Sequence, residues 1–184
     1  MVLSNQDERS LVDRAVAGDT NAFGELYARN LDAIYRYIYY RTGHQQDAED
    51  LAEHVFIKAW EALPGYRDYG HPFKSWLYRI AHNVVIDHHR RQRTQDESIQ
   101  TAFAELHEQE PATALGEVIR SEDMAHLAQA IASLSSEQQQ VIILRFVEGL
   151  SHAEIAHILG KNEGNCRMIQ HRALVVLNGL LTND

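Results

Sequence analysis

Apolar residues recur at every third or fourth position along most of the chain, which is the spacing of one buried face of an α-helix. Between positions 11 and 40 the pattern breaks once, at Gly18, and Asp19 or Thr20 can cap the helix that follows. The same spacing predicts further helices over about 46–63, 73–93, 118–134 and 136–149. No segment alternates apolar and polar residues long enough to require a sheet, so the sequence predicts an all-α fold.

The distribution of charge along the chain indicates how it is divided into domains. The formal net charge of −9 argues weakly against nucleic-acid binding. The local distribution is more informative, because from 79 to 93 four arginines face one aspartate, and from 94 to 123 eight acids face one arginine. The segment 94–116 is also poor in large apolar residues, which is typical of a linker. We therefore predict two small helical domains, 1–93 and 117–184, joined by a flexible acidic linker over 94–116.

A short helix, a glycine turn and a longer helix follow one another near the C-terminus. Ser151 and Glu154 have the spacing of a capping box. Gly160 suits the left-handed end of that helix, and Asn162 can cap the next one. This order is typical of a helix-turn-helix. The apolar stripe of the second helix consists of Cys166, Ile169, Ala173, Leu177 and Leu180.

The opposite side of this second helix is predicted to face outward, because successive helical residues are rotated by about 100°. It carries Asn165, Arg167, Met168, His171 and Arg172. Arginine can hold a phosphate or a guanine edge and asparagine can pair with an adenine edge, so these side chains are candidate DNA readers. An ordinary helical hairpin with a solvated polar face is the alternative.

A second candidate surface lies on the helix predicted over 73–93. One flank of this helix repeats, at intervals of three and four, Trp76, Arg79, Asn83, Asp87 and Arg90. Rings can stack on bases while guanidinium groups hold phosphates, so the flank suits single-stranded DNA, and the loop 66–72 before it could receive an unstacked base. Alternatively, Trp76 belongs to the core and the arginines form a solvated helix end, which the helix dipole favours.

The helix predicted over 46–63 begins with four acidic residues, Asp47, Glu49, Asp50 and Glu53. The helix dipole favours acids at an N-terminus, which is one explanation of their position. The alternative explanation is that the four acids form a docking surface for a basic partner.

Three stretches together resemble a known family. Residues 47–60 (DAEDLAEHVFIKAW) resemble region 2.2 of bacterial sigma factors, and residues 73–91 (FKSWLYRIAHNVVIDHHRR) resemble regions 2.3 and 2.4. Residues 151–160 (SHAEIAHILG) with 163–174 (EGNCRMIQHRAL) resemble region 4.2. Their order and separation resemble the extracytoplasmic-function (ECF, group 4) RNA polymerase sigma factors, which keep only sigma domains 2 and 4.

The resemblance implies a promoter-specific initiation factor that binds core RNA polymerase and catalyses no reaction itself. Domain 4 would read the minus-35 element as duplex with Asn165, Arg167, Met168, His171 and Arg172. Domain 2 would melt the minus-10 element and capture a flipped base with Tyr66, Arg67, Tyr69, Trp76, Arg79, Asn83, Arg90 and Arg91. Region 2.2 would dock on the β′ clamp helices with Asp47, Asp50, Leu51, Glu53 and Phe56. The β flap and an anti-sigma factor are the other implied partners.

Other interpretations remain open. A stand-alone repressor could use the same helix-turn-helix as a dimer, and an interaction protein without a DNA role is compatible with the acidic balance. The eleven histidines suggest a metal-dependent hydrolase only weakly, because no HExxH occurs, so we expect no metal and no cofactor. The single cysteine, the polar start and the absence of a long apolar run lead us to expect a cytoplasmic protein without membrane insertion.

Overall fold

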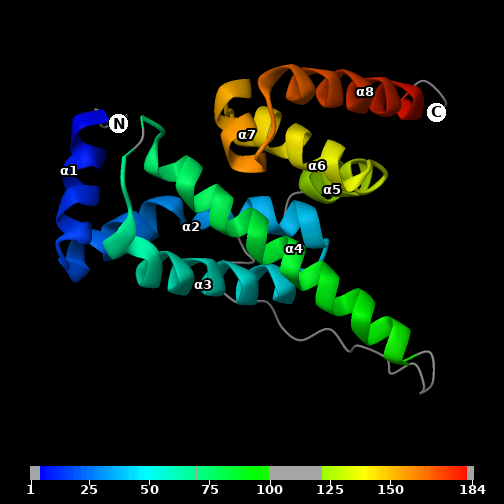
Figure 1. Cartoon of the computed structure of the whole chain (residues 1–184). Helices are drawn as coiled ribbons and strands as arrows, with labels where there is room; N and C mark the ends of the chain where they lie inside the picture. The colour runs from blue at the N-terminus through cyan, green and yellow to red at the C-terminus, as the bar shows by residue number, and fades with distance from the viewer. Residues whose placement is uncertain (1–4, 69, 100–121, 182–184) are drawn as a thin grey trace.

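The computed structural model describes residues 5–68, 70–99 and 122–181, and every regular element in this part of the chain is helical (Figure 1). The all-α fold predicted from the sequence is confirmed. In chain order the elements are α1 (Asn5–Val16), α2 (Thr20–Thr42), α3 (Gln45–Ala62), the 3₁₀ turn η1 (Leu63–Gly65), α4 (Phe73–Ile99), α5 (Glu122–Ala132), α6 (Ser136–Ile142), the π-helical turn η3 (Ile143–Val147), α7 (His152–Leu159) and α8 (Glu163–Leu181).

The helices form two groups, which we call the N-terminal half (α1–α4) and the C-terminal half (α5–α8). In the N-terminal half α2 packs against α1, α3 and α4. In the C-terminal half α8 packs against α6 and α7. Apolar side chains with no exposed surface fill both halves, and they include Ile34, Ile38, Val55, Leu77, Ile143, Leu144, Ile155 and Cys166. Each fully buried large side chain of this kind stabilises the fold by about 1.5–3 kcal/mol relative to exposure.

Most helix ends lie where the sequence predicts them, because local hydrogen bonds determine them. The Asp19 carboxylate accepts hydrogen bonds from the backbone N–H groups of Asn21 and Ala22 and so caps α2. Ser151 forms the predicted capping box at the start of α7. Gly160 ends α7 with a φ of 63°, a left-handed conformation that favours glycine. Both caps and the glycine turn depend only on residues that are close together in the chain, so they can be predicted from the sequence.

The helix α4 continues past the predicted end at Arg93, to Ile99. The added residues include the good helix formers Gln95 and Glu97 and neither glycine nor proline, so no strong helix breaker stands among them. The first residues of the predicted linker are therefore helical. The rest of that linker, residues 100–116, lies outside the described residues.

The predicted helix ending at Gly149 is interrupted by a wider turn. After α6 the backbone N–H of Glu148 donates to the carbonyl oxygen of Ile143 at 3.0 Å, a bond across five residues instead of four. This π-helical turn leaves Phe146 56% exposed and turns Glu148 into the protein. Turns of this kind occur often at functional sites.

The two halves pack against each other, with α7 along α4, and with α2 in contact with α5 and η3 (Figure 1). The buried guanidinium of Arg41 on α2 donates to the carbonyl oxygen of Ser136 at 3.0 Å and to Oε1 of Gln139 at 2.9 Å. The rings of His71 and His157 stack at 3.9 Å. We call this packed arrangement of the halves the closed form.

Replacing Ser151 by alanine removes the cap of α7, so we expect the free energy of unfolding in urea to fall by about 1 kcal/mol. The matched control is Ser133→Ala, because the Ser133 hydroxyl bonds the carbonyl of Ala130 and caps no helix N-terminus. That control should change stability by less than about 0.5 kcal/mol. Equal losses in the two variants would contradict the capping role.

Candidate nucleic-acid interface

The helix α8 is oriented by two small side chains on its inner side. Cys166 and Ala173 have no exposed surface. The cap predicted for this helix is present, because the backbone N–H of Asn165 donates to Oδ1 of Asn162 at 2.8 Å. Gln170, on the flank of the helix, bonds the ring of His152 at 2.7 Å.

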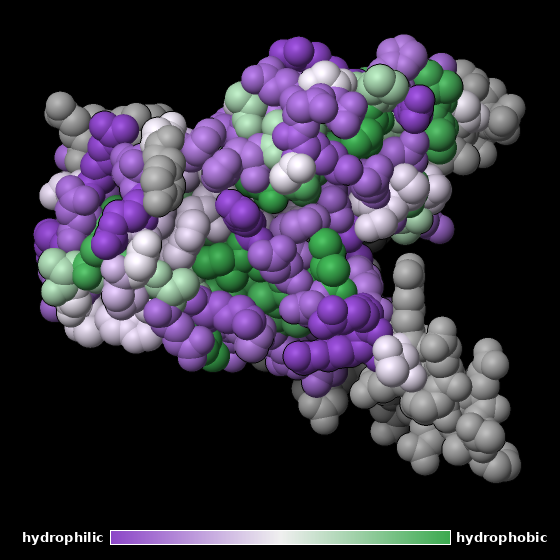
Figure 2. All heavy atoms as spheres, in the orientation of Figure 1, coloured by the Kyte–Doolittle hydropathy of each residue, from purple (hydrophilic) through white to green (hydrophobic). Residues whose placement is uncertain are grey.

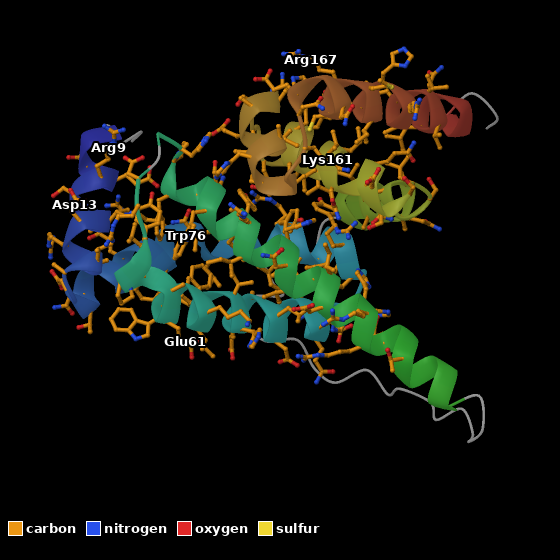
Figure 3. All side chains as sticks on the ribbon, viewed as in Figure 1. Arg9, Asp13, Glu61, Trp76, Lys161 and Arg167 are labelled. Atoms are coloured by element: carbon orange, nitrogen blue, oxygen red, sulfur yellow. The ribbon has the colours of Figure 1, made fainter. Side chains whose placement is uncertain are left out.

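The five predicted minus-35 residues all lie on the outer surface of α8. Asn165, Arg167, Met168, His171 and Arg172 are exposed, and Met168 is 51% exposed. The Arg167 guanidinium pairs with Glu163 at 2.7 Å, one turn earlier on the same helix. Figure 3 shows Arg167 on the side of α8 that faces away from the N-terminal half. The outer face of α8 is therefore accessible in the closed form.

An aromatic hollow forms where the loop 66–72 meets the start of α4. Trp76 is half-buried against Tyr66, with ring centroids 5.1 Å apart, and against Phe73 at 5.3 Å. Trp76 therefore combines both interpretations of the sequence, because it packs on the core and also lines a cavity of about 350 Å³. The other lining residues are Ala62, Gly65, Tyr66, Arg67, His71, Arg79 and His157. One of them, His157, belongs to the C-terminal half.

Asn83 lies elsewhere on α4. It is exposed and lines a second cavity of about 460 Å³, between α3 and α4, together with Lys58, Glu61 and Asp87. Arg90 and Arg91 are exposed farther along α4, where Arg90 pairs with Asp87 at 3.1 Å. Of the predicted minus-10 residues, Tyr66, Arg67, Trp76 and Arg79 therefore line one hollow and Asn83 lines another, and the two hollows share Ala62. Tyr69, also among them, lies outside the described residues.

The acidic start of α3 is mostly accessible. Asp50 and Glu53 are exposed, whereas Asp47 and Leu51 are half-buried. Asp47 lies 3.6 Å from Nε2 of His88 on α4, an ion-pair distance that is too long for a hydrogen bond.

Phe56, which was predicted to contact the polymerase, is not accessible in the closed form. Phe56 is 4% exposed and packs edge-on against Tyr27 at 4.7 Å, so its ring belongs to the core. Ile57 and Trp60, which sequence reasoning did not select, are instead exposed on α3, at 56% and 40%. The helical spacing of 46–63 contained this signal, because both residues lie off its apolar stripe.

A second exposed apolar group lies at the end of α8. Leu174, Val175 and Val176 are exposed there, and Figure 2 shows apolar surface at this end of the helix.

Three histidines lie where α4 meets α7 and α6. Burial, followed by the charges of Arg41 and Lys161, lowers the pKa of His82 to about 4. Burial also lowers the pKa of His89 and of His157, with smaller effects from neighbouring cations and histidines. In the folded chain His82 is therefore neutral at pH 7.

Because the pKa of His82 is lowered on folding, the unfolded chain takes up its proton first as the pH falls. Above about pH 6.5 His82 is neutral in both the folded and the unfolded chain, so it does not lower the free energy of unfolding. As the pH falls from there toward about 4, protonation of the unfolded chain lowers the free energy of unfolding. We expect the Tm of the protein to fall from pH 7 to pH 5, and to fall less in a His82→Gln variant. Parallel Tm curves for the two chains would contradict this role.

Two family models match the chain: Sigma-70 region 2 over residues 26–95 and Sigma-70 region 4 over residues 125–177. The ECF RNA polymerase sigma factor BldN of Streptomyces coelicolor is 40% identical over 174 residues, which cover 95% of this chain and 66% of BldN. The chain thus spans slightly less than two thirds of this relative. The ECF RNA polymerase sigma factor SigD of Mycobacterium tuberculosis is 35% identical over 181 residues, which cover 94% of this chain and 84% of SigD.

Solved structures agree with these relatives. CnrH, in complex with the cytosolic domain of CnrY, superposes with a TM-score of 0.74 at 26% identity, covering 96% of this chain and 98% of that chain. RpoE of Bartonella quintana, in complex with the anti-sigma factor NepR, superposes with a TM-score of 0.72 at 26% identity, covering 88% of this chain and 98% of that chain.

The fold and the exposed helix-turn-helix define an all-helical DNA-binding protein of the sigma factor class. The chain belongs to the ECF RNA polymerase sigma factor family. Within residues 5–68, 70–99 and 122–181, no helix combines the length and the hydropathy that a membrane crossing requires.

Proposed function

We propose that this protein is a promoter-specific transcription initiation factor that works with core RNA polymerase in the cytoplasm and catalyses no reaction itself. The observation that carries the proposal is the outer face of α8. The helix lies in the region that matches the Sigma-70 region 4 model, and it turns Asn165, Arg167, His171 and Arg172 away from its own core. Such a face fits the edges and phosphates of a DNA groove.

In this proposal the C-terminal half reads the minus-35 element as duplex, with the N-terminal part of α8 in the major groove. Asn165, Arg167, Met168, His171 and Arg172 are the readers. DNA must displace Glu163 from Arg167, and because that pair is exposed the cost is about 0–1 kcal/mol.

The N-terminal half binds the melted minus-10 element. The half-buried rings of Tyr66 and Trp76 line a cavity next to the guanidinium groups of Arg67 and Arg79, an arrangement suited to a flipped base and its phosphates. Asn83, Arg90 and Arg91 extend this surface along α4, and we assign Tyr69 to it from the family resemblance. The unstacking of the base costs a few kcal/mol, which such a cavity must offset.

Core RNA polymerase docks on α3. We assign Asp47, Asp50, Leu51 and Glu53 to contacts with the β′ clamp helices, and add the exposed Ile57 and Trp60 in place of the buried Phe56. The β flap of the polymerase contacts the C-terminal half. An anti-sigma factor is a further expected partner, as RpoE has in NepR. The proposed domains are residues 1–93 and 117–184, with the linker 94–116 between them.

The direct test is transcription in vitro with core RNA polymerase on a library of genomic DNA fragments, with and without the protein. New start sites that depend on the protein are expected. If no new start site appears, the proposal is refuted.

The variant Arg172→Ala should reduce transcription from protein-dependent promoters. It should also lower the slope of log affinity against log salt by about 0.9, because one phosphate contact is lost. Arg29→Ala is the control, since Arg29 forms an exposed ion pair with Glu25 on α2 and lines neither of the hollows along α4. Undiminished transcription by Arg172→Ala would exclude this side chain from minus-35 reading.

The variant Asn83→Ala should impair promoter melting more than initial binding, because its side chain is assigned to the melted strand. Melting is measured by permanganate reactivity of thymines and initial binding by filter retention at low temperature. Asn21→Ala, at an exposed position on α2, serves as the control. Equal losses in melting and initial binding would count against base capture by this residue.

A further inference from the structure

A single carboxylate connects the two halves of the closed form. The side chain of Glu148, in the C-terminal half, has no exposed surface. Its two oxygens accept hydrogen bonds from the guanidinium of Arg36 at 3.0 and 3.2 Å. The Tyr78 hydroxyl donates to the same carboxylate, and Nζ of Lys74 lies 3.5 Å away.

All three partners of Glu148 belong to the N-terminal half, where they form what we call the cationic notch: Arg36 on α2, and Lys74 and Tyr78 on α4. Burial alone would lower the pKa of Arg36, but the hydrogen bonds and charge of Glu148 raise it above its ordinary value. Burial and Glu148 raise the pKa of Tyr78, which therefore stays a hydrogen-bond donor. In the closed form two cations and one phenol hydroxyl of the notch therefore face a single anion, the Glu148 carboxylate.

The proposed function requires the Glu148 carboxylate to leave the cationic notch. The minus-10 and minus-35 elements are named from positions about 25 base pairs apart, which is about 85 Å of duplex at 3.4 Å per base pair. A compact chain of 184 residues has a radius of gyration of roughly 16 Å and so a diameter of about 40 Å. One closed molecule cannot reach both elements, so the halves must separate and Glu148 must leave the notch.

The empty notch would then be a ready anion site. The planar fork of Arg36, which holds the Glu148 carboxylate with two bonds, holds a phosphate equally well. Lys74 also lies in the first turn of the long helix α4, where the helix dipole favours an anion.

The position of the notch indicates which anion this is. Lys74 and Tyr78 lie on the same turns of α4 as Trp76 and Arg79, which line the aromatic hollow, although Lys74 and Trp76 point to different sides of the helix. In the closed form that hollow also receives a side chain from the C-terminal half, His157, which stacks on His71. The C-terminal half thus contacts both the hollow proposed for a base, through His157, and the cationic notch, through Glu148.

We infer that Arg36, Lys74 and Tyr78 form a binding site for a backbone phosphate of the melted promoter strand, and that Glu148 occupies this site in the closed form as a substitute for the phosphate. Closing and DNA binding then compete for the same three side chains. This inference rests on the proposed function, because that function supplies both the separation of the halves and the strand.

The first experiment measures opening, which does not depend on any promoter. Small-angle X-ray scattering of Glu148→Gln, which keeps the shape of the side chain but removes its charge, should give a larger radius of gyration than the unaltered chain. The control is Glu137→Gln, which removes an equal charge from an exposed pair with Lys161 within the C-terminal half. Unchanged scattering by Glu148→Gln would overturn the role of Glu148.

The second experiment measures the phosphate site with a fluorescent oligothymidylate of about 20 nucleotides, which requires no knowledge of the promoter. Glu148→Gln should bind it roughly fivefold more tightly than the unaltered chain, because more molecules are open. Adding Arg36→Ala or Lys74→Ala to Glu148→Gln should remove this gain and lower the salt slope by about 0.7. No gain, or a gain that persists in both double variants, would overturn the phosphate site.

Circular dichroism checks that each variant keeps its helices. If Glu148→Gln does not, Lys74→Ala alone is compared with the unaltered chain, because the Lys74 side chain is one-third exposed and its contact is the longest of the three. The same loss of about 0.7 in salt slope is then expected, and an unchanged slope overturns the site. Protein-dependent transcription with a negative result in these assays would leave the proposed function standing and refute the notch.

Discussion

The arrangement of the molecule depends on one buried carboxylate. A carboxylate withdrawn from water is costly unless charged donors surround it, and among the described residues Glu148 finds such donors in the N-terminal half. The closed form therefore joins the halves through a polar contact with exacting geometry, in addition to the packing of α7 on α4. A contact of this kind favours one arrangement of the halves, and in the proposed competition another anion takes the place of the carboxylate.

The π-helical turn links this contact to the DNA-reading half. The turn between α6 and α7 directs Glu148 across to α2 and α4, and it directly precedes the capping box that begins the helix-turn-helix. The outer face of α8 remains exposed while the aromatic hollow near Trp76 is shared with His157. The closed form thus leaves one proposed reading surface open and restricts the other.

Helix positions and the orientation of α8 could be predicted because their causes are local. A capping serine, a left-handed glycine and an apolar stripe act over a few residues, so Ser151, Gly160 and Cys166 took the roles that their spacing indicated. The assignment of Phe56 to a polymerase contact came from the family resemblance and not from this spacing, and the structure buries its ring in the core. The sequence pattern also gave no sign of the π-helical turn, in which the backbone N–H of Glu148 donates to the carbonyl oxygen of Ile143.

The sequence by itself determined the all-α fold, most helix ends, the helix-turn-helix and the resemblance to the ECF sigma factors, since each depends on short-range periodicity or on ordered motifs. Only the tertiary structure decided that Glu148 meets Arg36 and Lys74, that His157 stacks on His71, and that Asn83 and Trp76 line separate hollows. Arg36 and Glu148 are 112 positions apart, and no periodic pattern relates two residues at that distance. Their meeting depends on how the two halves pack against each other, which is a property of the folded chain.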